Sequence, residues 1–342
     1  MKKQITIRDV AEKTGFSFQT VSRIMNGNAD LHKPCTVKKV EQAAAELGYV
    51  QNLYAKVMQG GRTQSVGMII DPFTDSFTKD IFSGAHDELM KRDYMPILLL
   101  HRDDAHDEKL VKKLASHQVE GLILRPNPNR EECSEIAMVL DRYNMPVVSV
   151  DYALAKTQKY DFVGTADELG GQIAAEHFLE FGHRRMAGFF TPVDSLLLRQ
   201  KGFEEAIKRQ PGIAPPLLVT DFEFGSEVPA YHRIKSILSE PDAPTAFFAG
   251  GDFILPAIYR AANELGLRIP EDLSVIGFGD VDFSRHLVPP ATTFKQDAYE
   301  IGVHAAQLLI DRIESGDRQI PVREFRFKPQ LIQRGSTAPR EE

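Results

Sequence analysis

One face of the segment 17–26 carries polar side chains at the helical spacing i, i+3, i+4, i+7: Gln19, Ser22, Arg23 and Asn26. A glutamine can make two hydrogen bonds to adenine, and an arginine can make two hydrogen bonds to guanine. The spacing therefore predicts a helix whose polar face is suited to the edges of DNA bases.

Three short helices are predicted to position this face. Ile7, Val10, Ala11 and Thr14 have the spacing of an amphipathic helix, which Gly15 ends. Ser17 is a good N-cap for the second helix, and Asn26-Gly27 stops it. A third helix is predicted from Thr36, as N-cap, to Gly48. Two short helices around a glycine-containing turn form a helix-turn-helix unit.

The charge of the chain is distributed unevenly. The whole sequence of 342 residues has a formal net charge of −7, which by itself argues against nucleic-acid binding. Residues 1–62 carry ten Lys and Arg against five Asp and Glu, a net +5, whereas the other 280 residues carry −12. This asymmetry favours a separate DNA-binding segment, although a solvated basic face gives the same pattern.

Composition limits the remaining possibilities. The two cysteines exclude a disulfide framework and a cysteine-rich zinc module. The sequence has neither a secretion signal nor an apolar run of the roughly 18 residues that a membrane span needs. We therefore expect a cytoplasmic protein with no membrane partner.

Catalytic signatures are missing from the sequence. It has no His-Glu-x-x-His, no phosphate-binding loop, no nucleophile elbow and no dinucleotide-binding glycine motif. The ten histidines are scattered. We predict no catalytic residue, no metal site and no cofactor, so the chain is expected not to be an enzyme.

From Ser65 onward, apolar strand-like runs alternate with amphipathic stretches. The runs are Val66–Ile70, Pro96–Leu100, Val119–Leu124, Pro146–Val150, Arg185–Phe190, Ala246–Ala249 and Val275–Phe278. The helical stretches include Lys79–Arg92, Glu168–Phe181, Phe253–Leu265 and Asp297–Ser315. Such alternation predicts parallel sheets covered by helices on both faces, and the length suits two α/β subdomains.

The ordered motifs of the first fifty residues resemble the DNA-binding domain of the LacI family of bacterial transcription regulators. They are Thr6-Ile7-Arg8-Asp9-Val10-Ala11, Gly15, Gln19-Thr20-Val21-Ser22-Arg23, Asn26-Gly27, Leu47-Gly48-Tyr49 and Asn52. The resemblance implies that Phe18, Gln19 and Arg23 face the major groove. It also implies that Thr6, Thr20, Ser22 and Asn26 belong to the DNA-contacting set, with the last three fixing the helix against phosphates.

The segment after the third helix resembles the family's hinge helix. It comprises Asn52-Leu53-Tyr54-Ala55-Lys56-Val57-Met58, and it is too short to form a stable helix alone. The family usually has Arg-x-Leu where this chain has Lys56-Val57-Met58. The resemblance implies that Met58 acts as an apolar wedge in the minor groove, with linker packing as the alternative.

Later motifs resemble the family's effector domain, which has the type I periplasmic-binding-protein fold. They are Gly182-His183-Arg184-Arg185, Arg199 with Gly202-Phe203, Gly250-Gly251-Asp252, Ser274–Phe278, and Thr292-Thr293 with Gln296. The expected organisation is a helix-turn-helix domain at 1–50, a hinge and linker at 51–63, and an effector and dimerisation domain at 64–342. Its N-subdomain is expected at about 64–155 and 294–318, and its C-subdomain at about 160–290 and 321–334, with crossings near 151–162, 290–295 and 317–322.

The resemblance places the effector between the subdomains, outside the carboxyl ends of the strands. Arg199 matches the family's pocket arginine, and Phe77 matches a position that covers the ligand, although Phe77 also suits a core. Asp71 and Asp151 end strands and can accept hydroxyl hydrogen bonds or cap turns. Asp252 begins a helix and can serve as its N-cap. Further candidates are Phe248, Gln296 and Asp280.

Two positions depart from the family pattern. Gly279 stands where the family has an aspartate that contacts the ligand, in Gly277-Phe278-Gly279-Asp280, and Gly251 precedes Asp252 where the family has asparagine. Both changes remove polar groups from the expected pocket. The pocket therefore suits a bulkier ligand, or Asp280 replaces the missing aspartate.

The sequence thus predicts a transcriptional regulator, of the repressor type, whose affinity for DNA is controlled by a small molecule such as a sugar or sugar derivative. We expect a homodimer or a dimer of dimers on a pseudopalindromic operator. The alternatives are an α/β enzyme with a fused DNA-binding domain and a free periplasmic binding protein. The second alternative offers no use for residues 1–62.

Overall fold

A computed structural model describes residues 5–26, 29–50, 57, 61–70, 76–100, 104–126, 134–154, 160–220, 222, 227–316 and 321–340. The chain divides into an N-terminal unit, Met1–Gln64, and a C-terminal unit, Ser65–Glu342. This division lies one residue from the boundary predicted between linker and effector domain. Among the described residues, no helix combines the length and the apolar character needed to cross a membrane.

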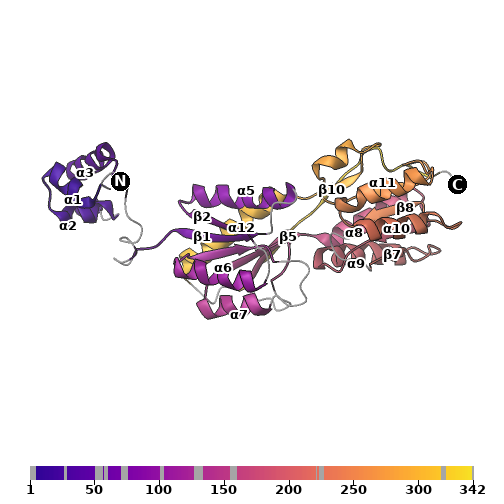
Figure 1. Ribbon diagram of the computed structural model, residues 1–342, viewed down its shortest axis with the longest axis horizontal. Helices are drawn as coiled ribbons and strands as arrows, with labels where there is room; N and C mark the ends of the chain where they lie inside the picture. Colours follow the sequence, from indigo (N-terminus) through magenta and orange to yellow (C-terminus); the bar gives the residue numbers. More distant parts are fainter. Residues whose placement is uncertain are drawn as a thin grey trace. The chain divides into compact units, whose positions relative to one another are not determined.

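The N-terminal unit contains the three predicted helices, α1 (Ile7–Thr14), α2 (Phe18–Met25) and α3 (Pro34–Leu47), with a short 3-10 helix at Ala29–Leu31 (Figure 1). Gly15 ends α1 at φ 73°, and the Ser17 hydroxyl accepts a hydrogen bond of 3.1 Å from the Thr20 amide to cap α2. The helices enclose a small core of Val10, Val21, Ile24, Val40, Ala43 and Ala44.

The start of α3 differs from the prediction. The helix begins at Pro34 rather than after Thr36, and Lys33 occupies its N-cap position. Proline suits the first helical turn because its fixed φ matches the helix and its missing N–H would have no helical partner there. The residue type favoured as a cap, Thr36, therefore lies inside the helix.

A six-stranded parallel sheet forms the first half of the C-terminal unit. Its order is β11-β5-β4-β3-β1-β2, with β1 (Ser65–Ile70), β2 (Met95–Leu100), β3 (Gly121–Leu124), β4 (Val147–Val150), β5 (Asp161–Thr165) and β11 (Glu324–Phe327). Helices cover both faces (Figure 1): α5 (Ser76–Lys91) and α12 (Ala298–Ser315) share one buried cluster with the sheet, and α6 (Asp104–Ser116) and α7 (Ser134–Tyr143) share the other.

The second half repeats this plan with a four-stranded parallel sheet. Its order is β7-β6-β8-β9, with β6 (Met186–Phe189), β7 (Leu217–Val219), β8 (Ala246–Ala249) and β9 (Ser274–Ile276). One cluster joins the sheet to α8 (Asp167–Glu180) and α9 (Asp194–Lys208), and another joins it to α10 (Glu227–Leu238) and α11 (Leu255–Glu264). Short 3-10 helices occur at Asp252–Ile254 and Asp282–His286, and β10 (Thr293–Lys295) pairs antiparallel with β12 (Gln330–Ile332).

The predicted subdomain limits need correction at two of the three crossings. Residues 161–165 and 324–327 were assigned to the second half, but β5 pairs with β4 and β11 pairs with β5 in the first sheet. The polar stretch after β4 therefore leads to a neighbouring strand of the same sheet. The chain passes to the second half between β5 and α8, and again between β11 and β12. The third crossing, near β10, lies where the sequence predicted it.

Two helix pairs pack with their backbones in contact. A Cβ atom on Gly171 of α8 would stand 1.9 Å from the carbonyl oxygen of Arg199, and one on Gly202 of α9 would meet the backbone of α8 at 1.8 Å. Gly84 of α5 and Gly302 of α12 are equally close to the opposite helix, at 2.0 and 1.8 Å. Only glycine fits these positions, so each half of the C-terminal unit contains one tightly joined helix pair.

Candidate functional site

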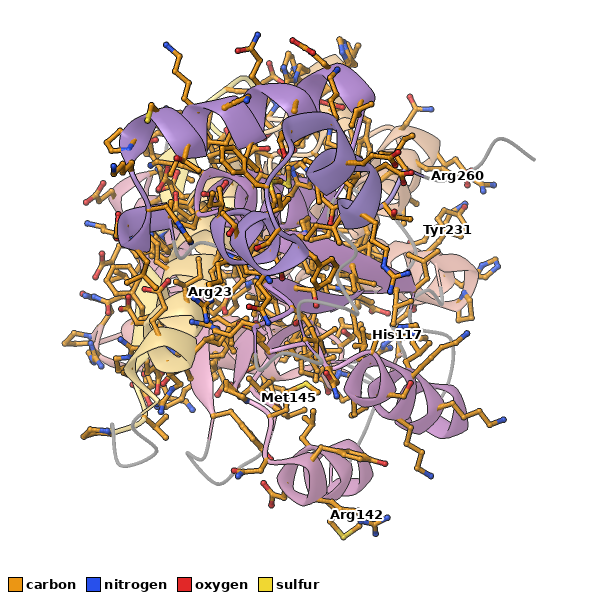
Figure 2. All side chains as sticks on the ribbon, turned by 90° about the vertical axis from the view of Figure 1, so that its left-hand side faces the viewer. Arg23, His117, Arg142, Met145, Tyr231 and Arg260 are labelled. Carbon is orange, nitrogen blue, oxygen red and sulfur yellow. The ribbon has the colours of Figure 1, made fainter. Side chains whose placement is uncertain are left out.

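The exposed face of α2 is the first candidate site. Val21 and Ile24 are buried in the small core, which leaves Gln19 and Arg23 exposed on the opposite side. Arg23 is labelled in Figure 2. Phe18 begins the helix and is 47% exposed, so its ring is available for contact with a partner. Exposed glutamine and arginine side chains one helical turn apart are suited to base edges in the major groove.

The other N-terminal candidates stabilise the ends of the helices. The Thr6 amide and hydroxyl both donate to Oδ2 of Asp9, at 2.7 and 2.6 Å, which fixes the start of α1. The Thr20 hydroxyl lies 2.9 Å from that of Ser17, and Asn26 Nδ2 donates to the Ser22 hydroxyl at 3.2 Å. These polar side chains thus order the two helices. The hinge candidates Asn52, Tyr54, Ala55, Lys56 and Met58 lie outside the described residues.

The second candidate site is a cavity of about 360 Å³ in the C-terminal unit. Residues from β5, β11, the loop after β4, and helices α8 and α9 surround it, so both halves contribute. Its lining comprises Asp151, Tyr152, Ala153, Phe162, Asp167, Asp194, Ser195, Leu197, Leu198, Lys201 and Arg326. A small-molecule site of this kind combines apolar walls with a few convergent polar groups.

A buried ion pair lies at the carboxyl ends of β3 and β4. Arg125 follows β3 and donates from Nε to Oδ2 of Asp151 at 2.9 Å, and its Nη2 lies 2.8 Å from the same oxygen. Nη2 also donates to the hydroxyl of Tyr152 at 3.3 Å. Burial raises the pKa of Tyr152, with the neighbouring Asp151 carboxylate adding to the effect, so Tyr152 stays protonated. Asp151 has a left-handed backbone at φ 65°.

A second buried pair joins α8 to α9. Arg199 Nε donates to Oδ1 of Asp167 at 2.8 Å, and Arg199 Nη1 donates to the carbonyl oxygen of Gly250 at 2.7 Å. The guanidinium carbon lies 3.7 Å from the centre of the Phe278 ring, which favours a cation–π contact. Burial raises the pKa of Asp167 to about 6, although Arg199 opposes the shift.

Asp252 and Asp280 lie at the edge of the second sheet. Asp252 accepts hydrogen bonds from the Val281 amide at 3.1 Å and from the Thr293 hydroxyl at 2.7 Å. Its burial raises its pKa to about 6. Asp280 is paired with Arg334, whose Nη2 lies 2.5 Å from Oδ1. Both carboxylates therefore bind groups of the protein, and neither is among the residues that line the cavity.

The remaining effector candidates have different surroundings. Phe248 is fully buried and packs between Phe190 and Phe203, with ring centres 5.6 and 5.3 Å away. It is therefore a core residue and no longer a candidate for contact with a ligand. Phe77 is half-buried against the cluster under α5. Gln296 accepts a hydrogen bond of 2.8 Å from the hydroxyl of Thr165. Asp71 lies outside the described residues.

Sequence reasoning missed several residues that the structure places at the cavity or one contact away from it: Arg125, Tyr152, Asp167, Ser195 and Arg326. Arg125 follows a strand directly, just as Asp151 does, so the rule that favours the carboxyl ends of strands could have found it. Asp167 gave no comparable signal, because an acidic residue at the start of a helix is ordinary. In the described part of the chain, His, Cys, Asp and Glu side chains form no group of three that could hold a metal ion.

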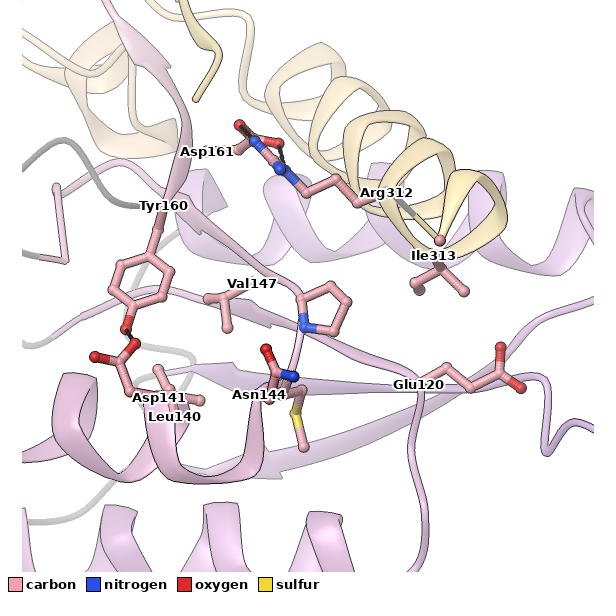
Figure 3. Close-up of a pocket in the computed structure, with 12 residues that line it drawn as sticks. Glu120, Leu140, Asp141, Asn144, Val147, Tyr160, Asp161, Arg312 and Ile313 are labelled. Carbon is pink, nitrogen blue, oxygen red and sulfur yellow. Dashed lines mark hydrogen bonds and ion pairs between the residues drawn. The ribbon is translucent and has the colours of Figure 1, made fainter. Parts of the chain in front are cut away.

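Figure 3 shows another cavity, of about 470 Å³, in the first half of the C-terminal unit. Glu120, Pro146 and Tyr160 line it and directly precede β3, β4 and β5, so it lies at the amino ends of these strands. The Tyr160 hydroxyl donates to Asp141 at 2.8 Å. Ligands of α/β folds bind at the opposite, carboxyl ends, so the 360 Å³ cavity is the better candidate for a ligand site.

Comparison with known proteins gives matches over nearly the whole chain. Residues 6–52 match the family described as "Bacterial regulatory proteins, lacI family", and residues 175–337 match a "Periplasmic binding protein-like domain". The ribose operon repressor of Escherichia coli K12 is 30% identical over 338 residues, which cover 97% of this chain and 99% of that protein. The HTH-type transcriptional repressor PurR of Aliivibrio fischeri MJ11 is 28% identical over 336 residues, which cover 97% of this chain and 98% of that protein.

Solved structures show the same similarity. The lac repressor dimer bound to operator and an anti-inducer has a TM-score of 0.83 at 25% identity, covering 98% of this chain and all of that one. A ribose-bound LacI-family regulator from Enterococcus faecium has a TM-score of 0.68 at 26% identity, covering 81% of this chain and all of that one. The sequence motifs, the two-unit fold and these matches agree, and the chain belongs to the lacI family of bacterial regulatory proteins.

Proposed function

We propose that this protein is a sequence-specific transcriptional repressor whose affinity for its operator is controlled by a small molecule. The observation that carries the proposal is the exposed face of α2, where Gln19 and Arg23 lie opposite a fully buried apolar face. The matched relatives are repressors rather than enzymes, which supports a binding role in the cytoplasm over catalysis.

The effector is proposed to bind in the 360 Å³ cavity and to be a sugar or a sugar derivative. Solved relatives hold ribose in one case and cellobiose in another. We assign Asp151, Tyr152 and Asp167, which line the cavity, to this site, together with Arg125 and Arg199, which bind two of these carboxylates. Because both halves of the C-terminal unit line the cavity, a bound ligand would favour one arrangement of the halves and so alter DNA affinity.

The protein is proposed to act as a homodimer on a pseudopalindromic site. The edge strand β2 supports this assembly, because Leu98 and Leu100 point to one face of the sheet and are each 42% exposed. An apolar edge strand is a natural surface for pairing with a second copy. The lac repressor relative is a dimer on its operator.

Selection of DNA from a random pool, followed by footprinting of the full-length protein, tests this proposal. We expect a pseudopalindromic sequence bound by two copies of the chain, with affinity that changes when a sugar is added. Selected sequences without two-fold symmetry, or binding that no added small molecule alters, would contradict it.

A further inference from the structure

Among the residues that the structure describes, each cationic side chain at the proposed effector cavity is paired with a carboxylate. Lys201 and Arg326 line the cavity, while Arg125 and Arg199 hold two of the lining carboxylates. The four pairs and their nitrogen–oxygen separations are Arg125–Asp151 at 2.8 Å, Arg199–Asp167 at 2.8 Å, Lys201–Glu168 at 3.0 Å and Arg326–Glu324 at 2.5 Å. The described lining residues comprise three carboxylates and two cations, so they carry no surplus of positive charge.

The two deepest pairs make the cavity unfavourable for an anion. The side chains of Arg199 and Asp167 are 6% and 2% exposed, and those of Arg125 and Asp151 are 9% and 5% exposed. Each arginine is already neutralised by its aspartate, so a phosphate or carboxylate that accepted its remaining N–H groups would add a buried negative charge with no described cation to balance it. An unbalanced buried charge is strongly unfavourable.

A hydroxyl group can join the same pairs without displacing either member. The hydrogen bonds of Arg199 to Asp167 and Gly250 use Nε and Nη1, whereas a guanidinium offers five N–H groups, so it can donate further to a ligand oxygen. Asp167 accepts from Arg199 through Oδ1, and a carboxylate can accept several hydrogen bonds. A hydroxyl donates and accepts at once, and it can therefore bond to both members of a pair while leaving their charges balanced.

Apolar surface completes the site. Phe162 and Leu198 line the cavity beside the polar groups. The guanidinium of Arg326 already covers the Phe162 ring, with its carbon 4.6 Å from the ring centre. The cavity therefore offers paired charges and some apolar wall, a combination that suits a molecule with many hydroxyl groups and a carbon skeleton but no formal charge.

We infer that the effector is an uncharged polyhydroxyl compound, a neutral sugar or polyol rather than a sugar phosphate or sugar acid, and that Asp167 sets this preference by occupying Arg199. The inference rests on the proposed function and narrows its ligand class. Asp167 is thus a specificity-determining residue that sequence reasoning had not identified.

Thermal unfolding of the full-length protein with matched ligand pairs tests the charge preference directly. Ribose is compared with ribose 5-phosphate, and glucose with glucose 6-phosphate and gluconate, each titrated to millimolar concentration. We expect a neutral member to raise the Tm and its charged counterpart to leave the Tm unchanged. A charged member that stabilises the protein as much as its neutral counterpart, or a panel in which no neutral sugar acts, would overturn the inference.

The variant Asp167→Asn tests the role assigned to Asp167. It keeps the side-chain volume but removes the negative charge that balances Arg199, so binding of the neutral sugar should weaken by about tenfold or more, and the charged counterpart should gain affinity relative to it. Glu176→Gln is the matched control, because Glu176 lies exposed on the same helix and bonds only to Gln172 among the described side chains. An unchanged ratio of neutral to charged affinity would refute the assignment, and circular dichroism checks that the variant is folded.

Failure of this inference is distinguishable from failure of the proposed function. Operator binding by the protein without ligand reports on the regulator itself. A charged effector that changes operator affinity would preserve the regulator and remove only the neutral-ligand inference. A protein that binds no DNA sequence selectively would remove the proposed function, whatever sugars it binds.

Discussion

The hydroxyl of Thr293 donates a hydrogen bond of 2.7 Å to Oδ1 of Asp252, although 41 residues separate them in the sequence. The contact fixes the loop after β8 against β10, where the chain passes between the two halves. Gly277 allows the approach, since a Cβ atom there would stand 2.0 Å from the same carboxylate oxygen. Asp252 therefore stabilises this junction, and burial raises its pKa to about 6.

Replacing Thr293 by valine should destabilise the protein in a pH-dependent way. Above pH 6 the Asp252 carboxylate is charged, and loss of its donor should lower the free energy of unfolding by about 1–3 kcal/mol. Near pH 5 the carboxyl is mostly protonated, so the loss should be smaller. Urea unfolding at pH 8 and pH 5 measures the difference. Thr293→Ser keeps the hydroxyl as the control, and an equal loss at both pH values would count against the bond.

Replacing Arg23 by alanine should weaken binding to the selected operator by about 1–3 kcal/mol while largely sparing random DNA. The reason is that Arg23 is exposed on the polar face of α2 and is suited to a base edge. Lys13→Ala removes the same charge from the unit, but Lys13 is paired with Glu46 at 2.7 Å, so it serves as the control. Fluorescence anisotropy measures the affinity of each variant for the operator and for random DNA. An equal loss of affinity for both DNAs would show that Arg23 does not recognise a base.

Protonation of His183 should destabilise the C-terminal unit in acid. His183 is 3% exposed, its Nδ1 lies 3.0 Å from the Thr245 hydroxyl, and burial is the main cause that lowers its pKa to about 4. The unfolded chain, with a pKa near 6.5, binds more protons between these values, so stability falls as the pH drops from 6.5 through 4. The full effect is about 3 kcal/mol.

The pKa values of Asp167 and Asp252 are shifted in the opposite direction to that of His183, so the effect of His183 must be isolated by comparing a variant with the wild type. Their pKa values are raised to about 6, so the cost of holding them charged falls as the pH drops below 6. Urea unfolding of His183→Gln and of the wild type between pH 7.5 and 4.5 isolates the histidine. The variant should lose less stability than the wild type in acid, whereas exposed His86→Gln should follow the wild type. Parallel curves for all three proteins would disprove the assignment.

Replacing Gly202 by alanine should destabilise the C-terminal unit by about 3 kcal/mol or more. The added methyl group would stand 1.8 Å from the carbonyl oxygen of Glu168, and a backbone atom cannot rotate away as a side chain can. Lys208→Ala, on an exposed face of the same helix, should cost less than about 1 kcal/mol. Thermal unfolding compares the stability of the two variants. A small loss of stability in Gly202→Ala would show that α8 and α9 can move apart at little energetic cost.

Replacing Leu98 by lysine should weaken the dimer, because it places a charge on the exposed edge strand β2. Light scattering after size-exclusion chromatography should show an increased fraction of monomer. Leu217→Lys provides the control, since Leu217 is also 42% exposed but lies on β7, at the edge of the other sheet. An unchanged mass for Leu98→Lys, or an equal loss of dimer in both variants, would place the interface elsewhere.

Much of the fold could be predicted from periodicity and caps. Val10, Val21 and Ile24 form the core of the N-terminal unit, as their spacing indicated, and Gly15 and Ser17 mark the helix ends as their conformational preferences require. The crossings were harder to predict. Nothing local tells whether a loop after β4 leads to the next strand of one sheet or to another sheet, because strand pairing is a long-range property.

The site was predicted less completely than the fold. Arg199 was a candidate because it belongs to a motif that resembles the family's, and Asp151 because it ends a strand; the structure places both in buried ion pairs. Its partner Asp167 is 32 residues from Arg199, and no sequence pattern links them. Phe248 was misjudged because an aromatic residue at a strand end is compatible with either a ligand or a core. Only the packing of Phe190 and Phe203 around it shows that it belongs to the core.

The joined helix pairs have a consequence for how such regulators can diversify. Gly171 and Gly202 in one half, and Gly84 and Gly302 in the other, contact backbone rather than side chains, so no compensating substitution nearby can make room for a larger residue. Leu197 and Leu198, by contrast, line a cavity, and Leu197 is 42% exposed, so a change of these side chains costs the scaffold less. Substitutions that accumulate over evolution would thus change the ligand that the cavity recognises and leave the packed helix pairs unaltered. A new effector specificity can then arise without changing the structure that links the ligand site to DNA binding.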